Sequence, residues 1–261
     1  MNLGLENRVA LVCGSSRGLG RAVADELAAE GASVALCARD AGDLARARAE
    51  IEAATGATVF TVAADLAVTG EPTRVAEESL AHFGRLDILI SNSGGPVAGS
   101  FATLARGDWS NATALLLMSA VELFTAVLPE MRGRRWGRIL AITSIAAREP
   151  VDNLMLSNSL RPAVAGLAHA LAREVAADGI TVNTILPGFT NTARMQELSV
   201  SSTPGAARAA GAGGSVLDAI PLGRLADPAE FAALAAFLVS ERASYITGAS
   251  FAVDGGWLRG L

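Results

Sequence analysis

A glycine-rich segment near the amino terminus has the residue types and the spacing to hold a phosphate group. This glycine loop comprises Gly14, Ser15, Ser16, Arg17, Gly18, Leu19 and Gly20. Glycine permits a sharp turn and lets backbone N–H groups approach a pyrophosphate, which then lies at the positive end of the following helix. The spacing GxxxGxG is wider than the dinucleotide motif GxGxxG, so a plain tight turn is the alternative. The loop ends the first strand of an alternating α/β pattern, and this position favours a nucleotide phosphate site.

Two arginines next to the phosphate site indicate which nicotinamide cofactor it would take. Arg39 ends the second apolar run, and Arg17 lies inside the glycine loop. An acid at the end of the second strand bonds the ribose 2′-hydroxyl of NAD, whereas an arginine there suits the 2′-phosphate of NADP. Two guanidinium groups can clamp that phosphate. Asp40 is the counter-argument, but it lies one residue further along, and two solvated surface arginines are the alternative. The pattern favours NADP(H) over NAD(H).

The bulk composition describes a globular protein and argues against several classes. The chain has 261 residues, 51% of them hydrophobic, and a net charge of −5. This acidic balance is unlike that of general nucleic-acid binders, and no uncharged apolar run approaches the roughly 18–20 residues of a membrane span. The amino terminus lacks the pattern of a signal peptide, and Cys13 and Cys37 lie in apolar runs that predict buried, reduced thiols. We expect a cytoplasmic protein with neither a nucleic-acid nor a membrane partner.

Other polar groups fit packing or surface positions better than chemistry. His82 and His169 are interpreted as surface or packing residues, and no His, Cys or acidic cluster has metal-ligand spacing, so no metal is expected. The run Met131–Arg138 is basic and contains a tryptophan, which could suggest nucleic acid. A solvated charged loop before a strand is the better interpretation.

Short apolar runs alternate with longer amphipathic stretches along the chain. Continuous apolar runs suit strands buried on both faces of a parallel sheet, and their alternation with helices predicts a doubly wound sheet with right-handed crossovers. The expected strands are Arg8–Cys13, Ser33–Ala38, Thr58–Ala63, Leu86–Ser91, Arg138–Thr143, Thr181–Leu186 and Ser250–Val253. The expected helices include Gly20–Glu30, Ala41–Ala54, Glu71–Phe83, Ala112–Leu128, Pro162–Ala177 and Pro228–Ser240. We therefore expect an α/β fold of the Rossmann type, a seven-stranded parallel sheet with helices on both faces, as one domain over residues 1–261.

One segment interrupts this alternation. Residues 199–215 are rich in alanine, glycine and serine. A flexible lid over the substrate, within a segment of about 190–220, is one interpretation, since long loops in compact domains are often functional. A plain surface loop is the other.

The order of the motifs resembles the short-chain dehydrogenase/reductase family, in particular its 3-oxoacyl-acyl-carrier-protein reductase branch. The glycine loop is similar to the family's TGxxxGxG, residues 91–94 (SNSG) stand where the family has NNAG, and residues 182–188 (VNTILPG) match VNxxxPG. The resemblance implies that Asp65 contacts adenine and that Thr192 holds the nicotinamide carboxamide. Beyond the glycine loop and Arg39, the cofactor-binding residues that it implies are Asp65, Leu66, Asn92, Ser93, Gly94, Arg161, Pro187, Gly188, Thr190 and Thr192.

The same resemblance reveals a departure at the catalytic positions. Reductases of the family use Asn, Ser, Tyr and Lys together, and only the serine is kept, as Ser144. Ser157 replaces the tyrosine, Arg161 the lysine and Leu116 the asparagine, while the only tyrosine, Tyr245, is far out of register. A serine hydroxyl is a much weaker acid than a phenol, whose pKa near 10 a neighbouring cation can lower. Arginine stays charged and cannot shuttle protons. The candidate catalytic residues are therefore Ser144, Ser157 and Arg161.

The helix that carries two of these residues contains a proline. Pro162 within a helix would clash with the carbonyl of Asn158 and remove one hydrogen bond. We therefore expect the helix to start late or to kink near Asn158–Ser159.

Three functions fit these residues. The favoured one is an NADP(H)-dependent oxidoreductase acting on a small carbonyl or alcohol substrate, with catalysis mainly by positioning and with water or the substrate as proton source. The second is a non-redox enzyme on the same fold; halohydrin dehalogenases resemble it in placing arginine at the lysine position, but they keep the tyrosine and lose the glycines. The third is a non-catalytic NADP(H)-binding sensor or assembly subunit. The resemblance also implies a homotetramer or homodimer, paired through the two long helices and the last strand.

Overall fold

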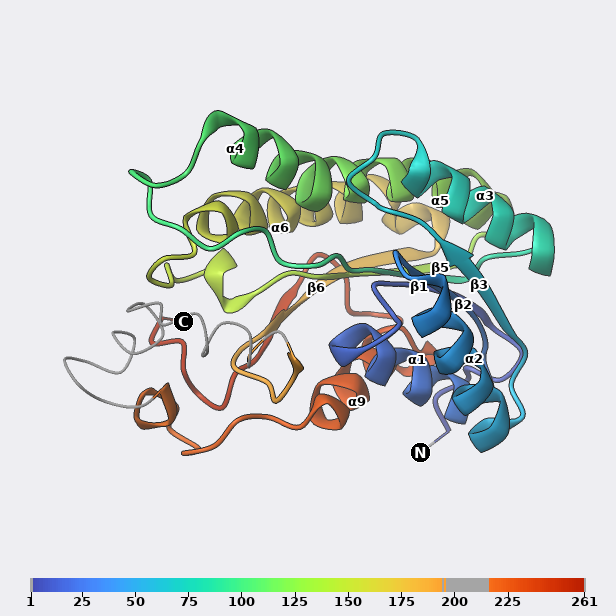
Figure 1. Ribbon diagram of the computed structural model, residues 1–261. Helices are drawn as coiled ribbons and strands as arrows, with labels where there is room; N and C mark the ends of the chain where they lie inside the picture. Colours follow the sequence, from blue (N-terminus) through green and yellow to red (C-terminus); the bar gives the residue numbers. More distant parts are fainter. Residues whose placement is uncertain (1, 194, 196–215, 261) are drawn as a thin grey trace.

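Seven parallel strands form the centre of the structure, in the order β3-β2-β1-β4-β5-β6-β7 (Figure 1). The computed structural model describes residues 2–193, 195 and 216–260. The strands are β1 (Val9–Cys13), β2 (Ser33–Ala38), β3 (Val59–Ala63), β4 (Ile88–Ser91), β5 (Gly137–Ile142), β6 (Ile180–Pro187) and β7 (Ser250–Val253). Each expected strand is present, with ends that differ by at most two residues. The predicted seven-stranded Rossmann-type α/β fold is confirmed.

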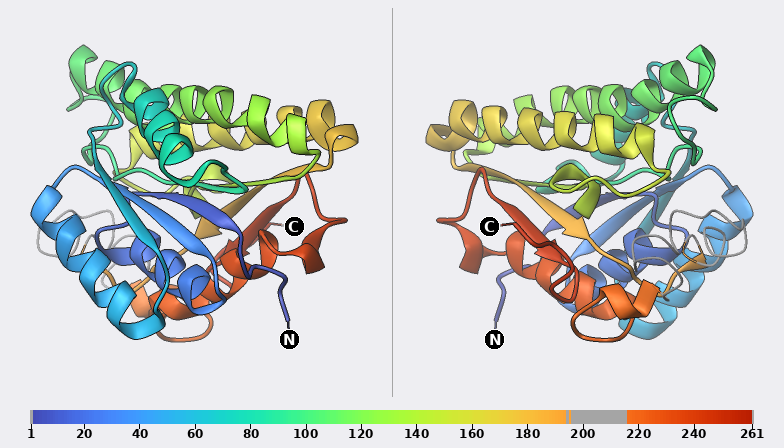
Figure 2. Two further views of the ribbon diagram at one scale, coloured as in Figure 1. Left: turned by 90° about the vertical axis from the view of Figure 1, so that its right-hand side faces the viewer. Right: turned by 90° about the vertical axis from the view of Figure 1, so that its left-hand side faces the viewer.

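Helices cover both faces of the sheet and make three layers (Figures 1 and 2). On one face lie α1 (Gly18–Ala29), α2 (Ala41–Thr55) and α9 (Pro228–Leu238). On the other face lie α3 (Glu71–Phe83), α4 (Arg106–Thr113), α5 (Ser119–Arg134) and α6 (Met155–Val175), and a π-helical turn, η1 (Ala114–Met118), joins α4 to α5. Short 3-10 turns follow β5 (η2, Ile145–Ala147), follow α6 (η3, Ala176–Asp178), precede α9 (η4, Val216–Ala219) and follow α9 (η5, Glu241–Ala243).

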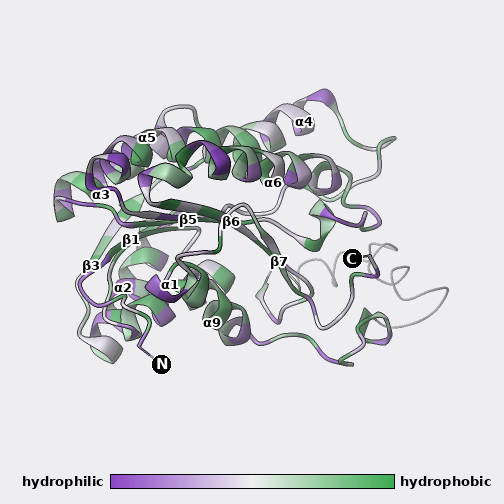
Figure 3. Ribbon diagram, turned by 180° about the vertical axis from the view of Figure 1, so that it is seen from behind, coloured by the Kyte–Doolittle hydropathy of each residue, from purple (hydrophilic) through white to green (hydrophobic). Residues whose placement is uncertain are grey.

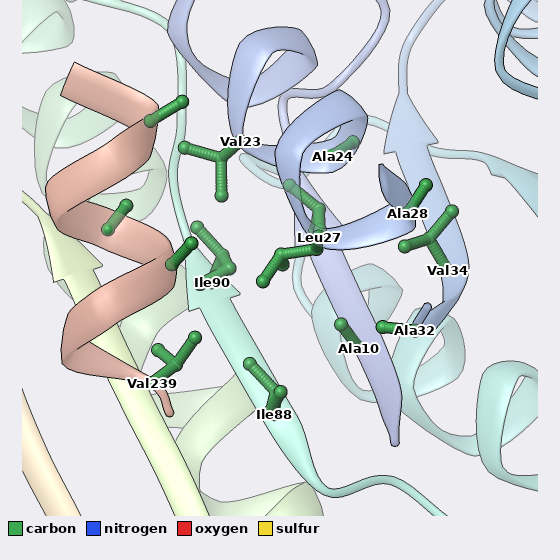
Figure 4. Packing of buried hydrophobic residues seen from close by; sticks show 14 of the residues in the cluster. Ala10, Val23, Ala24, Leu27, Ala28, Ala32, Val34, Ile88, Ile90 and Val239 are labelled. Atoms are coloured by element: carbon green, nitrogen blue, oxygen red, sulfur yellow. The ribbon is translucent and has the colours of Figure 1, made fainter. Parts of the chain in front are cut away.

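The two helical layers bury apolar side chains against the sheet from both sides. All five residues of β1 are buried, as expected for a central strand covered on both faces. On the α1 face, Val23 and Leu27 pack toward Ile88 and Ile90 of β4 (Figure 4). Figure 3 shows hydrophobic residues through the middle of the sheet and along α9. Burial of this kind stabilises the fold by about 25 cal/mol per Å² of apolar surface.

The sheet changes winding direction between β1 and β4. From β1 the chain builds outward through β2 and β3, and from β4 it builds the opposite way through β5, β6 and β7. The loops that follow β1 and β4 therefore separate at the carboxyl edge of the sheet. In open α/β sheets ligands bind in the crevice at this switch point.

Helix α6 differs from the expectation at its amino end. It begins at Met155, seven residues before the expected Pro162, and runs without interruption to Val175, so the late start is wrong. The first turn is supported by the Asn158 side chain, whose Oδ1 accepts the N–H of Val151 at 3.0 Å while its Nδ2 donates to the Val151 carbonyl at 2.9 Å. These bonds offset part of the roughly 3 kcal/mol that a proline costs inside a helix. The kink near Asn158–Ser159 stays a prediction.

The lid-like segment of about 190–220 lies largely outside the described residues. The described parts at its two ends are joined by an isolated parallel bridge between Thr190 and Ala226. Its role as a lid stays a prediction.

Candidate functional site

The glycine loop crosses the carboxyl end of β1 in a conformation that its glycines permit. Gly14 and Gly18 have φ of +60° and +64°, in the left-handed region that other residues rarely adopt. A side chain on Gly20 would overlap the carbonyl oxygen of Gly14, so helix and loop pack directly against each other. Helix α1 starts at Gly18, and its N-cap residue, Arg17, makes no side-chain capping bond. The first N–H groups of α1 thus lack a side-chain cap, and such a helix end binds anions.

Ser15 and Asn92 hold the loop in place from the sheet. The buried Ser15 hydroxyl donates to the carbonyl of Val12 at 2.7 Å and accepts the N–H of Cys37 at 3.1 Å. The Ser15 N–H in turn donates to the Cys37 carbonyl at 3.1 Å. From β4, the Nδ2 of Asn92 donates to the carbonyl of Cys13 at 3.1 Å. Ser15 therefore uses its own polar groups to fix the loop on β1 and β2.

Arg39 and Asp40, which the sequence analysis weighed for cofactor preference, lie at the end of β2. Among the described residues, no hydrogen bond or ion pair engages the exposed guanidinium of Arg39. The Asp40 carboxylate instead accepts the N–H of Asp43 at 2.7 Å and caps α2. A carboxylate committed to a helix cap is poorly placed to bind a ribose hydroxyl as well, so the geometry weakens the one sequence feature that favoured NAD(H).

The expected adenine contact lies at the end of β3. Asp65 is exposed, and its Oδ1 accepts the N–H of Ala67 at 3.0 Å, which shapes a turn there. Leu66 is buried in the core below it. On the far side of the switch point, Ser93 is half-buried and Gly94 is exposed, with open space where a side chain on Gly94 would be.

The residues expected on the nicotinamide side of the site lie at the carboxyl end of β6. Pro187 ends the strand, and a side chain on Gly188 would come within 2.7 Å of the Cα of Asp254. The Thr190 hydroxyl is buried and has no hydrogen-bond partner among the described residues. The Thr192 hydroxyl donates to the Thr190 carbonyl at 3.4 Å.

The polar groups and the open surface described above could accommodate a dinucleotide. A buried hydroxyl without a partner costs free energy unless a ligand or a water bonds it, and Thr190 is such a group. Above Gly18 the nearest atom to an added side chain would be a methyl of Thr192 at 3.8 Å, so the loop surface is open. The described residues therefore fit a nicotinamide dinucleotide held between the glycine loop and the end of β6.

The candidate catalytic residues follow β5 or lie on the first turns of α6, the helix that Arg161 joins to the end of β5. Ser144 follows β5 and caps η2, its hydroxyl accepting the N–H of Ala146 at 3.1 Å. Ser157 is buried on the first turns of α6. The Arg161 guanidinium, one turn later, donates from Nη1 to the carbonyl of Ile142 at 2.9 Å. Arg161 thus has a structural role, since it ties α6 to the end of β5 as well as placing a permanent charge there.

The loop after β4 is fastened to the start of α6, which the sequence analysis missed. The N–H of Gly99 donates to the carbonyl of Asn153 at 2.8 Å, and the N–H of Met155 donates to Gly99 at 3.3 Å. Asn153 has φ of +60°, a left-handed conformation that asparagine tolerates better than most residues. Leu116 is buried within the π-helical turn η1. Such turns occur often at functional sites, and no local sequence signal identifies them.

The chain's other proton-transfer groups lie away from these residues. The sequence contains no lysine, and its only phenol, Tyr245, is fully exposed in the segment before β7. The ring of His82 stacks on Phe60 at 4.2 Å, and the Nδ1 of His169 pairs with the carbonyl of Gly248 at 2.8 Å. Both histidines therefore have the packing roles expected of them. No phenol, imidazole or ammonium group stands at the candidate site.

The two thiols lie in register on β1 and β2. The hydrogen bond that the Cys13 thiol donates to Cys37, together with burial, raises the pKa of the Cys13 thiol well above its ordinary value. Both cysteines are buried and free, as expected. A neutral buried thiol is a poor nucleophile.

The basic run before β5 is only partly solvated, which corrects the sequence interpretation. Arg138 is buried and donates to the carbonyls of Ser240 and Gly137, at 3.3 and 2.8 Å. The ring of Trp136 lies between the guanidinium groups of Arg138 and Arg8, 4.3 and 3.8 Å from its centre. Burial lowers the pKa of Arg138. Aromatic stacking lets these guanidiniums pack instead of projecting into water.

Metal ligation has no candidate group in the part of the chain that the structure describes: no three His, Cys, Asp or Glu side chains gather there. The expectation of a metal-free site stays a prediction.

Comparisons with known proteins agree with this geometry. Residues 14–258 match a family described as enoyl-(acyl carrier protein) reductase. The chain is 34% identical to the 3-oxoacyl-[acyl-carrier-protein] reductase FabG of Salmonella typhimurium over 256 residues, which covers 97% of this chain and 98% of that protein. The FabG of Escherichia coli is also 34% identical, over 254 residues, with the same coverage.

Two solved structures show the same similarity. The L-sorbose reductase of Gluconobacter frateurii, complexed with NADPH and L-sorbose, superposes with a TM-score of 0.91 at 34% identity, covering 100% of both chains. A 3-oxoacyl (acyl-carrier-protein) reductase of Agrobacterium tumefaciens with NADP bound superposes with a TM-score of 0.88 at 32% identity, covering 97% of this chain and 95% of that one.

Proposed function

Because the chain belongs to the short-chain dehydrogenase/reductase family, we propose that it is an NADP(H)-dependent oxidoreductase acting on a carbonyl or alcohol group through an atypical active site. The observation that carries the proposal is the intact glycine loop, seated by Ser15 and Asn92 against the uncapped end of α1. A chain with no use for the cofactor would have little reason to keep it. The similar L-sorbose reductase, in complex with NADPH, supports the same cofactor here.

Different residues would bind different parts of the cofactor. The glycine loop would hold the pyrophosphate, Arg39 and Arg17 the 2′-phosphate, and Asp65 the adenine. Thr192 would hold the carboxamide, and the unsatisfied hydroxyl of Thr190 would give the cofactor a further hydrogen bond. Bound NADPH would supply a hydride. Arg39 extends from the end of β2 with its guanidinium unengaged among the described residues, which supports NADP(H) over NAD(H).

The chain's own residues would contribute to catalysis mainly by positioning the substrate. Ser144 and Ser157 offer hydroxyls that orient a substrate oxygen, and Arg161 provides a charge that does not titrate near neutral pH. None of these three residues resembles the tyrosine of the usual reductases, whose phenol has a lowered pKa. Holding the reactants in the productive geometry can still account for several kcal/mol of the activation barrier.

A second candidate is a non-catalytic NADP(H)-binding sensor or assembly subunit. The observation that favours it is the combined replacement of three catalytic positions, with Leu116 buried where the family has asparagine. In this case NADPH would bind with the same micromolar or tighter affinity, but no carbonyl compound would oxidise it.

We propose a homodimer or homotetramer paired through the long helix Arg106–Arg134, which comprises α4, η1 and α5. Only 39% of its most apolar 18-residue stretch is buried within the domain, and Met118 of η1 is 44% exposed. By length and composition the helix could also cross a membrane, but its inner residues Leu123 and Phe124 are buried in the domain. Its Glu122 accepts the N–H of Gly70 at 2.9 Å. These contacts are typical of a helix that packs within its own domain. A second copy of this chain would pack against the face of the helix that the domain leaves exposed. A cytoplasmic location stays a prediction.

Titration of the purified protein with NADPH and NADH, followed by fluorescence, tests the cofactor assignment. We expect micromolar or tighter binding of NADPH and much weaker binding of NADH. A carbonyl-substrate screen monitored by NADPH loss then separates the two candidates. Binding of neither nucleotide would refute both.

A further inference from the structure

Among the described residues, the candidate site offers no phenol, imidazole or ammonium group as a proton donor, and this restricts the substrates it can reduce. The chain has no lysine and one tyrosine, which lies fully exposed before β7. Its histidines are engaged with Phe60 and Gly248, and its thiols are buried between β1 and β2. Two described carboxylates are engaged as well: Asp254 accepts two backbone N–H groups and Glu149 accepts one. Ionised carboxylates cannot donate a proton at neutral pH.

We propose that this protein reduces quinones and related conjugated carbonyls, and that isolated ketones are poor substrates. The inference rests on the proposed oxidoreductase function and narrows its substrate class. Reduction adds a hydride from the reduced nicotinamide to the acceptor, which leaves the nicotinamide oxidised. With an isolated ketone, the hydride bonds to the carbonyl carbon and the C=O π pair moves onto that oxygen as an alkoxide. With a quinone, the hydride forms an O–H bond at one carbonyl oxygen, the ring becomes aromatic, and the displaced electron pair moves onto the other oxygen as a phenolate. In both cases the oxyanion later takes a proton from water.

The acidity of the product decides whether a proton donor is needed. An isolated ketone gives an alkoxide, whose conjugate acid has a pKa close to that of water, about 16. A quinone gives a phenolate-type anion, whose conjugate acid resembles tyrosine with a pKa near 10. The second anion is more stable by about six pKa units and can leave the site without prior protonation. General acid catalysis, typically worth about 10²- to 10⁴-fold, is therefore lost for ketones but matters little for quinones.

The residues that remain suit an oxyanion. Arg161 places a permanent positive charge at the end of β5, where the guanidinium is held by the Ile142 carbonyl. The hydroxyl of Ser144, held by the N–H of Ala146, and that of Ser157 can each donate one hydrogen bond to an oxygen. Donors and a fixed charge stabilise developing negative charge without transferring a proton.

The loop joined to α6 adds apolar and aromatic surface near these residues. Phe101 is 72% exposed and Val97 is 56% exposed, which is unusual for such side chains. Phe101 meets the ring of Trp109 edge-on at 6.4 Å. The bridge between Gly99 and Leu154 fixes this loop beside the first turn of α6. A planar aromatic acceptor suits this surface better than a polyhydroxylated substrate.

The test compares two acceptors with the same bicyclic skeleton, 1,4-naphthoquinone and 2-tetralone, at constant NADPH. We expect kcat/KM for the quinone to exceed that for the ketone by at least about 100-fold. The quinone rate, corrected for the non-enzymatic reaction, should stay flat between pH 6 and pH 9, because serine hydroxyls and a guanidinium group do not change their protonation in this range. Equal reduction of 2-tetralone, or a titrating limb in this range, would overturn the proposal.

A gain-of-function variant separates missing acid catalysis from the greater intrinsic reactivity of quinones. The double variant Ser157→Tyr with Arg161→Lys restores a phenol and an ammonium group. It should raise the 2-tetralone rate by about 100-fold and give that rate a pH dependence, so the ratio of the quinone rate to the 2-tetralone rate should fall by at least about tenfold. The matched control is Ser159→Tyr, an exposed position two residues away on the same helix, which should change neither rate.

Failure of the proposal is distinguishable from failure of the proposed function. NADPH binding is titrated for each variant, so a variant that does not fold is recognised and the wild-type acceptor comparison and pH profile decide alone. Reduction of 2-tetralone but not of the quinone refutes the substrate class and leaves an oxidoreductase. Binding of NADPH without oxidation by either acceptor refutes the oxidoreductase and favours the sensor, and the quinone assignment falls with it.

Discussion

The replacement Arg39→Ala should convert a protein selective for NADPH into one that barely distinguishes the two cofactors. Arg39 stands exposed at the end of β2, and among the described residues nothing engages its guanidinium. A hydrogen bond to a charged group contributes about 1.5–3 kcal/mol. Because solvent screens an exposed pair, the lower figure applies, and 1.5 kcal/mol corresponds to about a tenfold change in Kd. The NADPH Kd should therefore rise about tenfold and the NADH Kd less than twofold.

The assay is a fluorescence titration of both cofactors at two salt concentrations. The preference of the wild type for NADPH should shrink as salt rises, since screening weakens the guanidinium–phosphate attraction. The matched control is Arg48→Ala, an exposed arginine on α2 that pairs with Glu52 at 2.8 Å. Equal weakening of NADPH and NADH by Arg39→Ala, or an unchanged preference, would refute the reasoning and leave Arg39 a solvated surface residue.

Three further predictions concern the folded chain. Gly20→Ala would place a methyl group on a loop carbonyl, so we expect loss of nucleotide binding and a Tm lower by several degrees, measured by calorimetry. A hydrogen bond from Arg224 holds the pKa of Glu230 at about 2, below its ordinary 4.5, so this carboxylate stabilises the fold above pH 4.5 and ceases to do so as pH falls through 2. Glu230→Gln should lower Tm at pH 7, and the difference from the wild type should vanish on acidification; a pH-independent difference would contradict this. The hydrogen bond with Cys37 and burial raise the pKa of Cys13, so iodoacetamide should label neither thiol until denaturant is added, as mass spectrometry would show.

The fold could be predicted closely because its signals are local and repeated. The apolar run of β1 and the glycines that end it need no distant partner to be recognised, and parallel strands buried on both faces have few alternatives. The start of α6 could not be predicted in the same way. Its first turn depends on Asn158 reaching back to Val151, which is a contact of the folded loop rather than a propensity. The helix therefore extends to Met155 although it contains Pro162.

In the candidate site too, some features could be predicted from the sequence and others depend on tertiary contacts. Residue identity alone predicts the phosphate loop and shows that no lysine and only one tyrosine exist in the chain. It could not show that Asp40 is taken up by the cap of α2 or that the Thr190 hydroxyl is buried without a partner among the described residues. Side chains of the same type bind a ligand or support the backbone according to their neighbours, and those neighbours come from distant parts of the chain.

The sequence by itself determined the parallel α/β fold, the glycine loop and the absence of lysine from the chain, because each depends on residue type and short spacing. The tertiary structure alone decided which polar groups are available. It committed Ser15 to the sheet and Arg161 to the end of β5, and left Arg39 exposed. The physical reason is that a hydrogen bond is satisfied across space, so a residue's partner depends on the folded surroundings and not on its position in the chain.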